Sequence, residues 1–164
     1  SAPSLHNSVA NAAIRLVSER AAERGDGLVL VLGEMLEMGA QAAAIHHEIG
    51  AVAGASGARA IAFIGSQSAA YEAGVGSVRA AGASDILLRS FETSDEASPW
   101  VVDTVKAGDM LLLKGSRGLR VERVREALVQ DVNERAAKKP SSPVLVDQAQ
   151  TDGKDTGPVA EEKR

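Results

Sequence analysis

Short runs of aliphatic residues alternate with amphipathic stretches along most of this chain of 164 residues, and this alternation constrains its fold more than any other feature. The runs lie at residues 28–32 (LVLVL), 60–64 (AIAFI), 86–89 (ILLR) and 110–114 (MLLLK). They are short and almost uniformly apolar, which is typical of strands covered on both faces. We therefore predict four strands with helices between them.

The amphipathic stretches predict five helices. The first is predicted to begin at its cap, Ser4, and to end at Gly25, and others to cover residues 40–53, 68–81 and 119–137. A further helix is predicted to begin at a cap on Thr93 or Ser94, with acidic residues in its first turn. The apolar face of the first helix is predicted to consist of Val9, Ala13, Leu16 and Val17. Glycines at positions 74 and 76 weaken the helical pattern of residues 68–81.

Alternation of strands and helices with short connections predicts right-handed crossovers and a parallel sheet. The expected fold class is therefore α/β: a Rossmann-like, mostly parallel sheet with helices on both faces. Polar or glycine-rich segments follow three of the strands, namely GEMLEMG (33–39), GSQS (65–68) and KGSRG (114–118). Ligands of such sheets bind beyond the carboxyl ends of the strands, so these three segments are expected on one edge.

Composition limits the function. Hydrophobic residues make up 45% and aromatic residues 2%, so the core must consist of Ala, Val, Ile and Leu. A net charge of −4 argues against nucleic acid as a partner, and the lack of cysteine excludes thiolate chemistry and disulfides. No apolar run reaches the ~20 residues that span a bilayer, and no signal peptide opens the sequence. A cytoplasmic protein without a membrane span is expected.

Residues 1–137 are predicted to form one domain, and the composition changes after it. Residues 138–164 are rich in Pro, Ser, Gly and charge, which predicts a disordered tail. An extra edge strand at residues 144–146 (VLV) is the alternative. The chain begins with Ser1 inside a helix-capping segment, so we expect it to be part of a longer polypeptide.

The segment KGSRG combines an ammonium, a hydroxyl, a guanidinium and two glycines after a predicted strand. Backbone and side-chain donors at a helix N-terminus suit a carboxylate or a phosphate. Lys114, Gly115, Ser116 and Arg117 are therefore candidate anion-binding residues. The alternative, which spacing alone does not exclude, is a tight turn with its two cations in solvent.

Glu34 directly follows the first predicted strand, so its carboxylate is expected at the edge of the sheet. It could accept a hydrogen bond from an amine, a ribose hydroxyl or a magnesium-bound water. A solvated carboxylate is the alternative for Glu34, and it is the favoured interpretation for Glu37. Met35, Leu36 and Met38 would then cover the end of the sheet.

Other polar residues give weaker signals. His46 and His47 are adjacent in a predicted helix and cannot share a face, and a lone helical histidine is most often structural. Ser66, in GSQS, is a candidate for lining the cleft, and Glu37, His46 and Ser66 together are candidate supporting residues. No metal site, no G-x-S-x-G nucleophile motif and no phosphate-binding loop G-x-x-x-x-G-K-[ST] is found, so no catalytic residue is assigned.

Three blocks of the sequence together resemble the carboxy-terminal domain of the Mur ligase family, and most closely of its D-alanyl-D-alanine-adding member. The family patterns are V-L-G-[DE]-M-x-E-L-G, L-H-x-E-V-G and G-D-x-V-L-V-K-G-S-R-G-x-x-x-E-x-V. The first two blocks match at Gly33, Glu34, Met35, Glu37, Gly39, His46, Glu48 and Gly50. The third matches at Gly108, Asp109, Lys114, Gly115, Ser116, Arg117, Gly118 and Glu122. Near the start, Pro3 matches the family segment Y-N-A-N-P-x-S, but Ala2 replaces its asparagine.

The resemblance implies a three-domain, ATP-dependent amide ligase of peptidoglycan synthesis. In that family an amino-terminal domain holds the UDP-N-acetylmuramoyl-tripeptide, and a central domain holds ATP and Mg. The last domain closes over both and helps to seat D-alanyl-D-alanine, which attacks an acyl phosphate of the tripeptide. The partners implied for this chain are thus those two domains and both substrates, and the chain alone is expected to be inactive.

Two rival interpretations stay open at this stage. One is a free-standing Rossmann-like module that binds a nucleotide or an anion without catalysis. The other is a Mur ligase that adds a different amino acid, which we rank lower because KGSRG is closest to the dipeptide-adding enzyme.

Overall fold

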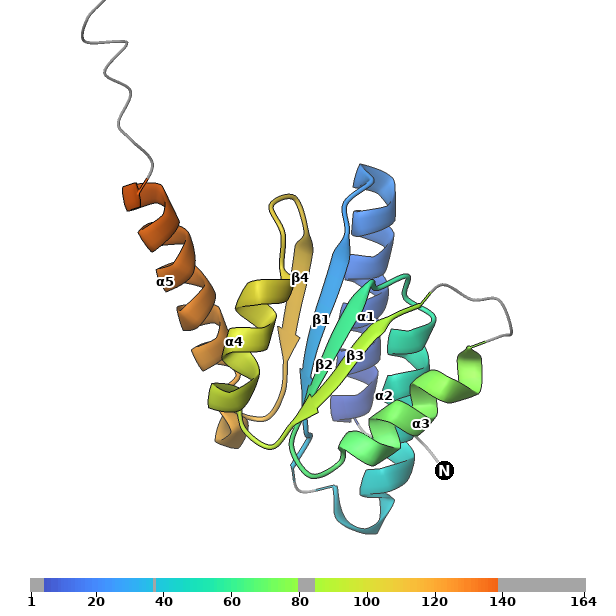
Figure 1. Cartoon of the computed structure of the whole chain (residues 1–164). Helices are drawn as coiled ribbons and strands as arrows, with labels where there is room; N and C mark the ends of the chain where they lie inside the picture. Colours follow the sequence, from blue (N-terminus) through green and yellow to red (C-terminus); the bar gives the residue numbers. More distant parts are fainter. Residues whose placement is uncertain (1–4, 37, 80–84, 139–164) are drawn as a thin grey trace, which may run out of the picture. The chain divides into compact units, whose positions relative to one another are not determined.

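A computed structural model describes residues 5–36, 38–79 and 85–138 of the chain (Figure 1). The helices are α1 (Leu5–Arg24), α2 (Ala42–Gly54), α3 (Ser68–Val78), α4 (Ser94–Thr104) and α5 (Glu122–Lys138). The strands are β1 (Leu28–Gly33), β2 (Ala60–Ile64), β3 (Leu87–Phe91) and β4 (Met110–Lys114). Single 3₁₀ turns cover Gly39–Gln41 and Arg117–Leu119. The predicted cap Ser4 and the alternative strand at 144–146 lie outside the described residues, as does nearly all of the predicted tail.

The strands of the described residues form one parallel sheet in the order β3-β2-β1-β4. The predicted α/β class is confirmed. β1 and β2 lie in the middle and are buried along their whole length. Because side chains alternate along a strand, Leu30 and Leu32 of β1 face one side and Val31 the other.

Helices cover both faces of the sheet. On one face α1, α2 and α3 contribute Ile14, Ile49 and Val75 to an aliphatic core (Figure 1). On the other, α4 and the first half of α5 contribute Val101 and Val124. The buried stripe of α1 is not the predicted one, because Val9 and Leu16 are 46% and 53% exposed. It consists instead of Ala10, Ile14, Ala21 and partly Val17.

The last helix also differs from the prediction. It begins at Glu122 rather than Leu119, because residues 117–119 form a 3₁₀ turn and Arg120 adopts a left-handed conformation (φ 52°). Ser1–Gln130 and Asp131–Arg164 are two separate compact units, so α5 begins in the first and ends in the second. Val132, in the second half of α5, is 61% exposed.

Helices α2 and α3 touch through their backbones at two glycines. A Cβ atom on Gly74 would lie 2.0 Å from the carbonyl oxygen of His47, and one on Gly50 would lie 2.2 Å from that of Tyr71. Any side chain at either position would drive the helices apart. The helix-weakening Gly74 is therefore explained by packing.

The amino ends of β2 and β4 are joined by a half-buried ion pair. The carboxylate of Asp109, whose side chain is 7% exposed, accepts hydrogen bonds from the Arg59 guanidinium and from the Lys106 N–H (2.8 Å). Arg59 also donates to the carbonyl of Thr104 (2.7 Å). The hydrogen bond from Arg59 lowers the pKa of Asp109, with burial opposing it and the Lys106 N–H assisting.

Substitution of the two α3 glycines should have opposite effects. Gly74→Ala is expected to lower the free energy of unfolding by about 3 kcal/mol, because the added methyl group meets the α2 backbone. Gly76→Ala, in the same helix with no atom near its Cβ position, should raise it by about 0.5 kcal/mol. Urea unfolding measures both, and equal losses at the two positions would contradict the packing argument.

Asp109→Asn is expected to lower the free energy of unfolding by about 2 kcal/mol at neutral pH, because Arg59 loses its carboxylate partner. Since the pKa of Asp109 is lowered by folding, its contribution is complete above the unfolded pKa of about 3.9 and disappears as the pH falls through the folded value. The difference between wild type and variant should therefore shrink in urea titrations at acidic pH. Asp26→Asn, in the exposed pair with Arg24, is the control and should change stability little. A difference independent of pH would refute this linkage.

Candidate functional site

The three segments that follow β1, β2 and β4 meet at the carboxyl edge of the sheet. The hydroxyl of Ser116 accepts a hydrogen bond from the Leu36 N–H (2.7 Å), and the Ser116 N–H donates to the carbonyl of Glu34 (3.3 Å). The Glu34 N–H in turn donates to the carbonyl of Ile64, the last residue of β2 (2.8 Å). Segments 80 residues apart in the sequence are thereby joined, as the parallel order predicts.

Two glycines allow this close approach. A Cβ atom on Gly115 would lie 3.0 Å from the Cα of Gly33, and one on Gly33 would lie 3.2 Å from the Cα of Gly115. β1 and β4 thus converge just where they end. Gly118 is similarly close to Leu36, since a Cβ atom there would lie 3.0 Å from the Leu36 Cδ1. The glycines of KGSRG seat the turn against the segment after β1.

A hollow of about 460 Å³ lies between these two segments. One wall is apolar and the other polar and cationic; the lining residues are Met35, Leu36, Met38, Lys114, Gly115, Ser116, Arg117 and Gly118. Lys114 and Arg117 form no ion pair with any residue that the structure describes. Their charges are therefore available to an anion in the hollow.

Glu34 faces a different neighbour. Its carboxylate accepts hydrogen bonds from both the N–H and the hydroxyl of Ser66, each at 2.9 Å. Gly65, with φ 116°, leaves room for this carboxylate, because a Cβ atom there would lie 2.7 Å from Glu34 Oε2. Glu34 does not line the hollow beside Lys114. The structure therefore places Glu34 with Ser66, and Ser116 with the segment after Glu34.

Two buried aromatic side chains support the backbone beside Glu34. His46 accepts a hydrogen bond from the Met35 N–H (2.8 Å), and the Tyr71 hydroxyl donates to the carbonyl of Gly33 (2.7 Å). The rings of His46 and Tyr71 meet edge to face at 5.0 Å, and Tyr71 stacks on Phe63 at 4.5 Å. Burial, with a smaller effect of the Glu34 carboxylate, raises the pKa of Tyr71 well above its usual value, so the phenol keeps its proton.

Sequence reasoning missed Tyr71. A signal was present, because Tyr71 is the one tyrosine of a chain with 2% aromatic residues. A buried tyrosine needs a partner for its hydroxyl, and an aliphatic core offers few. Its partner, however, comes from β1, 38 residues away, and only the fold reveals it.

One expectation about KGSRG was wrong. The segment does not open directly into a long helix, because α5 begins at Glu122 and the carbonyl groups of Ser116 and Arg117 accept from Leu119 and Arg120 within a 3₁₀ turn. The dipole of α5 therefore does not act at this turn, since that effect is confined to a helix's first turn. The cationic character of the corner rests on Lys114 and Arg117.

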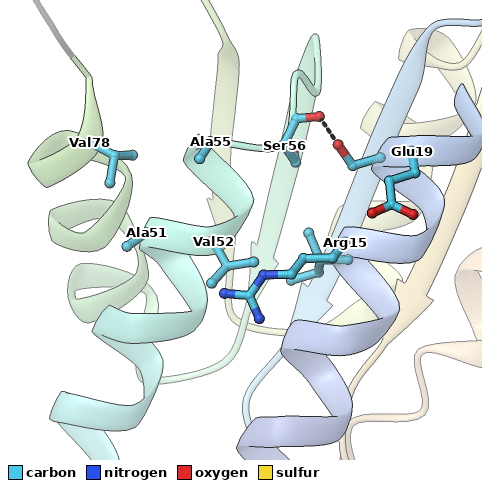
Figure 2. A pocket seen from close by; sticks show the side chains of 9 residues that line it. Arg15, Glu19, Ala51, Val52, Ala55, Ser56 and Val78 are labelled. Carbon is cyan, nitrogen blue, oxygen red and sulfur yellow. Dashed lines mark hydrogen bonds between the residues drawn. The ribbon is translucent and has the colours of Figure 1, made fainter. Parts of the chain in front are cut away.

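A second hollow, of about 430 Å³, lies between α1 and α2 (Figure 2). Figure 2 shows Arg15 and Glu19 on α1, with Val52 of α2 and Ala55, the residue after α2, across from them. The hydroxyl of Ser18 donates to the carbonyl of Ser56 (2.6 Å), so this edge of the hollow is already closed by a hydrogen bond. We take the hollow at the strand ends as the candidate site, because the predicted anion-binding residues 114–117 line it.

Metal ligands do not cluster in the part of the chain that the structure describes: no three His, Cys, Asp or Glu residues gather at one point. Glu37 lies outside the described residues. Within them, no helix is both long and apolar enough to cross a membrane.

These features define a parallel α/β domain with a hollow, lined by Lys114 and Arg117, at the carboxyl ends of its strands. A family model described as "Mur ligase, glutamate ligase domain" matches residues 6–117. Because this match covers more than half of the chain, the chain belongs to the Mur ligase family. The comparison with curated proteins gives no match.

Solved structures of MurF share the fold. A structure of MurF from Acinetobacter baumannii is 23% identical with a TM-score of 0.58, over 73% of this chain and 26% of that one. The MurF ligase from Thermotoga maritima in complex with ADP is 22% identical with a TM-score of 0.52, over 76% of this chain and 27% of that one. This chain spans about a quarter of the length of the MurF structures that it matches.

Proposed function

We propose that this chain is the carboxy-terminal domain of an ATP-dependent amide ligase that adds D-alanyl-D-alanine to UDP-N-acetylmuramoyl-tripeptide. The observation that carries the proposal is the hollow between Leu36 and the Lys114–Arg117 corner, in a domain of the Mur ligase family. One wall can accept a carboxylate and the other a methyl group. A dipeptide of alanine presents both within a few ångströms.

The corner Lys114–Ser116–Arg117 is proposed to bind the carboxylate of the dipeptide. The two cations supply charge-assisted donors, and Arg117 can engage both carboxylate oxygens at once. A phosphoryl oxygen is the second anion that the same donors would accept. Glu34, held by Ser66, is proposed to orient the attacking amine or a nucleotide hydroxyl from the neighbouring edge.

ATP and magnesium are assigned mainly to the central domain of the intact protein. The sequence has no G-x-x-x-x-G-K-[ST] loop, and the described residues lack a cluster of three metal ligands. The proposed partners of this chain are thus the amino-terminal and central domains of the same polypeptide, which it closes upon. The intact ligase would act in the cytoplasm, in the peptidoglycan synthesis on which cell shape and division depend.

Two other functions compete with this one. A free-standing module that binds a nucleotide or an anion would use the same hollow, but the family match makes it the less favoured interpretation. A Mur ligase that adds a different amino acid ranks lower, because KGSRG is closest to the dipeptide-adding enzyme. The coding sequence upstream of Ser1 separates module from ligase, because a G-[TS]-x-G-K-[TS] loop is expected there for a ligase.

Arg117→Ala in the intact ligase is expected to raise the KM for D-alanyl-D-alanine at least tenfold, because a charge-assisted bond is worth about 1.5–3 kcal/mol. Arg125→Ala is the matched control. It removes the same charge from α5 at an exposed residue that does not line the hollow. Steady-state kinetics with varied dipeptide measures both, and unchanged kinetics in Arg117→Ala would rule out the assignment.

Kinetics with a dipeptide whose carboxyl terminus is amidated will show whether Arg117 binds the dipeptide carboxylate or a phosphoryl group. If Arg117 binds the dipeptide carboxylate, the amide should bind wild type poorly and lose little more in Arg117→Ala. If Arg117 binds a phosphoryl group, the variant should impair dipeptide and amide equally.

The 164-residue chain alone is expected neither to hydrolyse ATP nor to join the dipeptide to the precursor, because it carries no phosphate-binding loop. Release of phosphate from ATP in the presence of both substrates measures this. Turnover by the purified chain would argue against the assignment of catalysis to other domains.

A further inference from the structure

His46 connects α2 to the wall of the candidate site. Its side chain is completely buried, with Nε2 2.8 Å from the Met35 nitrogen and Nδ1 2.6 Å from the carbonyl oxygen of Ala42. A peptide N–H can only donate and a carbonyl can only accept. The ring must therefore be neutral, with its proton on Nδ1 and the lone pair of Nε2 facing Met35.

Met35 lies between the two residues that connect with the other segments of the site. On one side, the carbonyl of Glu34 accepts from the Ser116 N–H, and the Glu34 carboxylate binds Ser66. On the other, the Leu36 N–H donates to the Ser116 hydroxyl. A displacement of the Met35 N–H would therefore move the peptide units that fix Ser116.

We infer that His46 is a positioning residue of this site: it holds the Met35 peptide so that Leu36 and Ser116 keep the hollow in its binding shape. His46 does not line the hollow itself, so it acts through Met35. The inference rests on the proposed function only for the identity of the ligand. His46 therefore does more than pack in the core. An apolar side chain of equal size would leave the Met35 N–H without its hydrogen-bond acceptor.

The two nitrogens of His46 can be separated by substitution. His46→Asn keeps an amide nitrogen near the place of Nδ1, where it can still donate to Ala42, but has no atom that reaches Met35. His46→Gln carries its amide oxygen to about the place of Nε2 and can accept from the Met35 N–H. His47→Asn is the control, because it makes the same change at the next residue, which is exposed.

Hydrogen exchange in the intact protein tests the contact directly. In His46→Asn the amides of Met35 and Leu36 should exchange about tenfold faster, as expected for the loss of one buried hydrogen bond. In His46→Gln they should stay within about threefold of wild type, and in His47→Asn they should not change. Equal exchange in the Asn and Gln variants would overturn the inference. If His46→Asn fails to fold, His46→Gln decides alone, and tenfold faster exchange in it would overturn the inference.

Kinetics of the intact ligase tests the consequence for binding. The KM for D-alanyl-D-alanine should rise about fivefold in His46→Asn with little change in kcat, and His46→Gln should restore it. If Arg117→Ala raises this KM and the two His46 variants do not differ, His46 has no positioning role although the proposed function stands. If Arg117→Ala has no effect, the proposed function fails, and the exchange experiment still decides whether His46 holds the Met35 peptide.

Discussion

The hydrogen bonds of the backbone from Gly33 to Leu36 are the interaction on which the candidate site depends. This segment leaves the sheet at the end of β1, where its polar groups lose the regular ladder partners and must find others. The Tyr71 hydroxyl donates to the carbonyl of Gly33, and His46 accepts from the Met35 N–H. The Glu34 N–H donates to the carbonyl of Ile64, and its carbonyl accepts from the Ser116 N–H. The Ser116 hydroxyl accepts from the Leu36 N–H. Four parts of the fold thus fix one short stretch of chain.

The close contact of α2 and α3 makes that arrangement possible. His46 lies on α2 and Tyr71 on α3, and their rings meet because the two helix backbones touch at Gly50 and Gly74. A larger residue at either glycine would separate the helices and withdraw both side chains from β1. Gly50 and Gly74 therefore contribute to the site as well as to the core.

The amino and carboxyl edges of the sheet differ in the charges that they carry. At the amino ends, Arg59 and Asp109 neutralise each other in a half-buried pair, so that end contributes to stability. At the carboxyl ends, Lys114 and Arg117 have no acidic partner among the described residues, and the hollow beside them is left cationic. A parallel sheet permits this division because all of its strands begin at one edge and end at the other. The residues that stabilise the sheet and those proposed to bind the ligand therefore lie one strand length apart.

The α/β class, the strands at 28–32 and 60–64 and the contact of KGSRG with GEMLEMG could all be predicted from the amino-acid sequence. Aliphatic runs and glycine-bounded turns are local signals, and the parallel order then places the strand ends at one edge. The buried stripe of α1, the start of α5 at Glu122 and the contact of Glu34 with Ser66 became clear only from the folded chain. It alone also revealed Tyr71 and the tautomer of His46. The contacts of Glu34, Tyr71 and the Nε2 atom of His46 join residues more than ten positions apart, and such partners leave no periodic trace in a single sequence. The start of α5 depends instead on the local turn at residues 117–120.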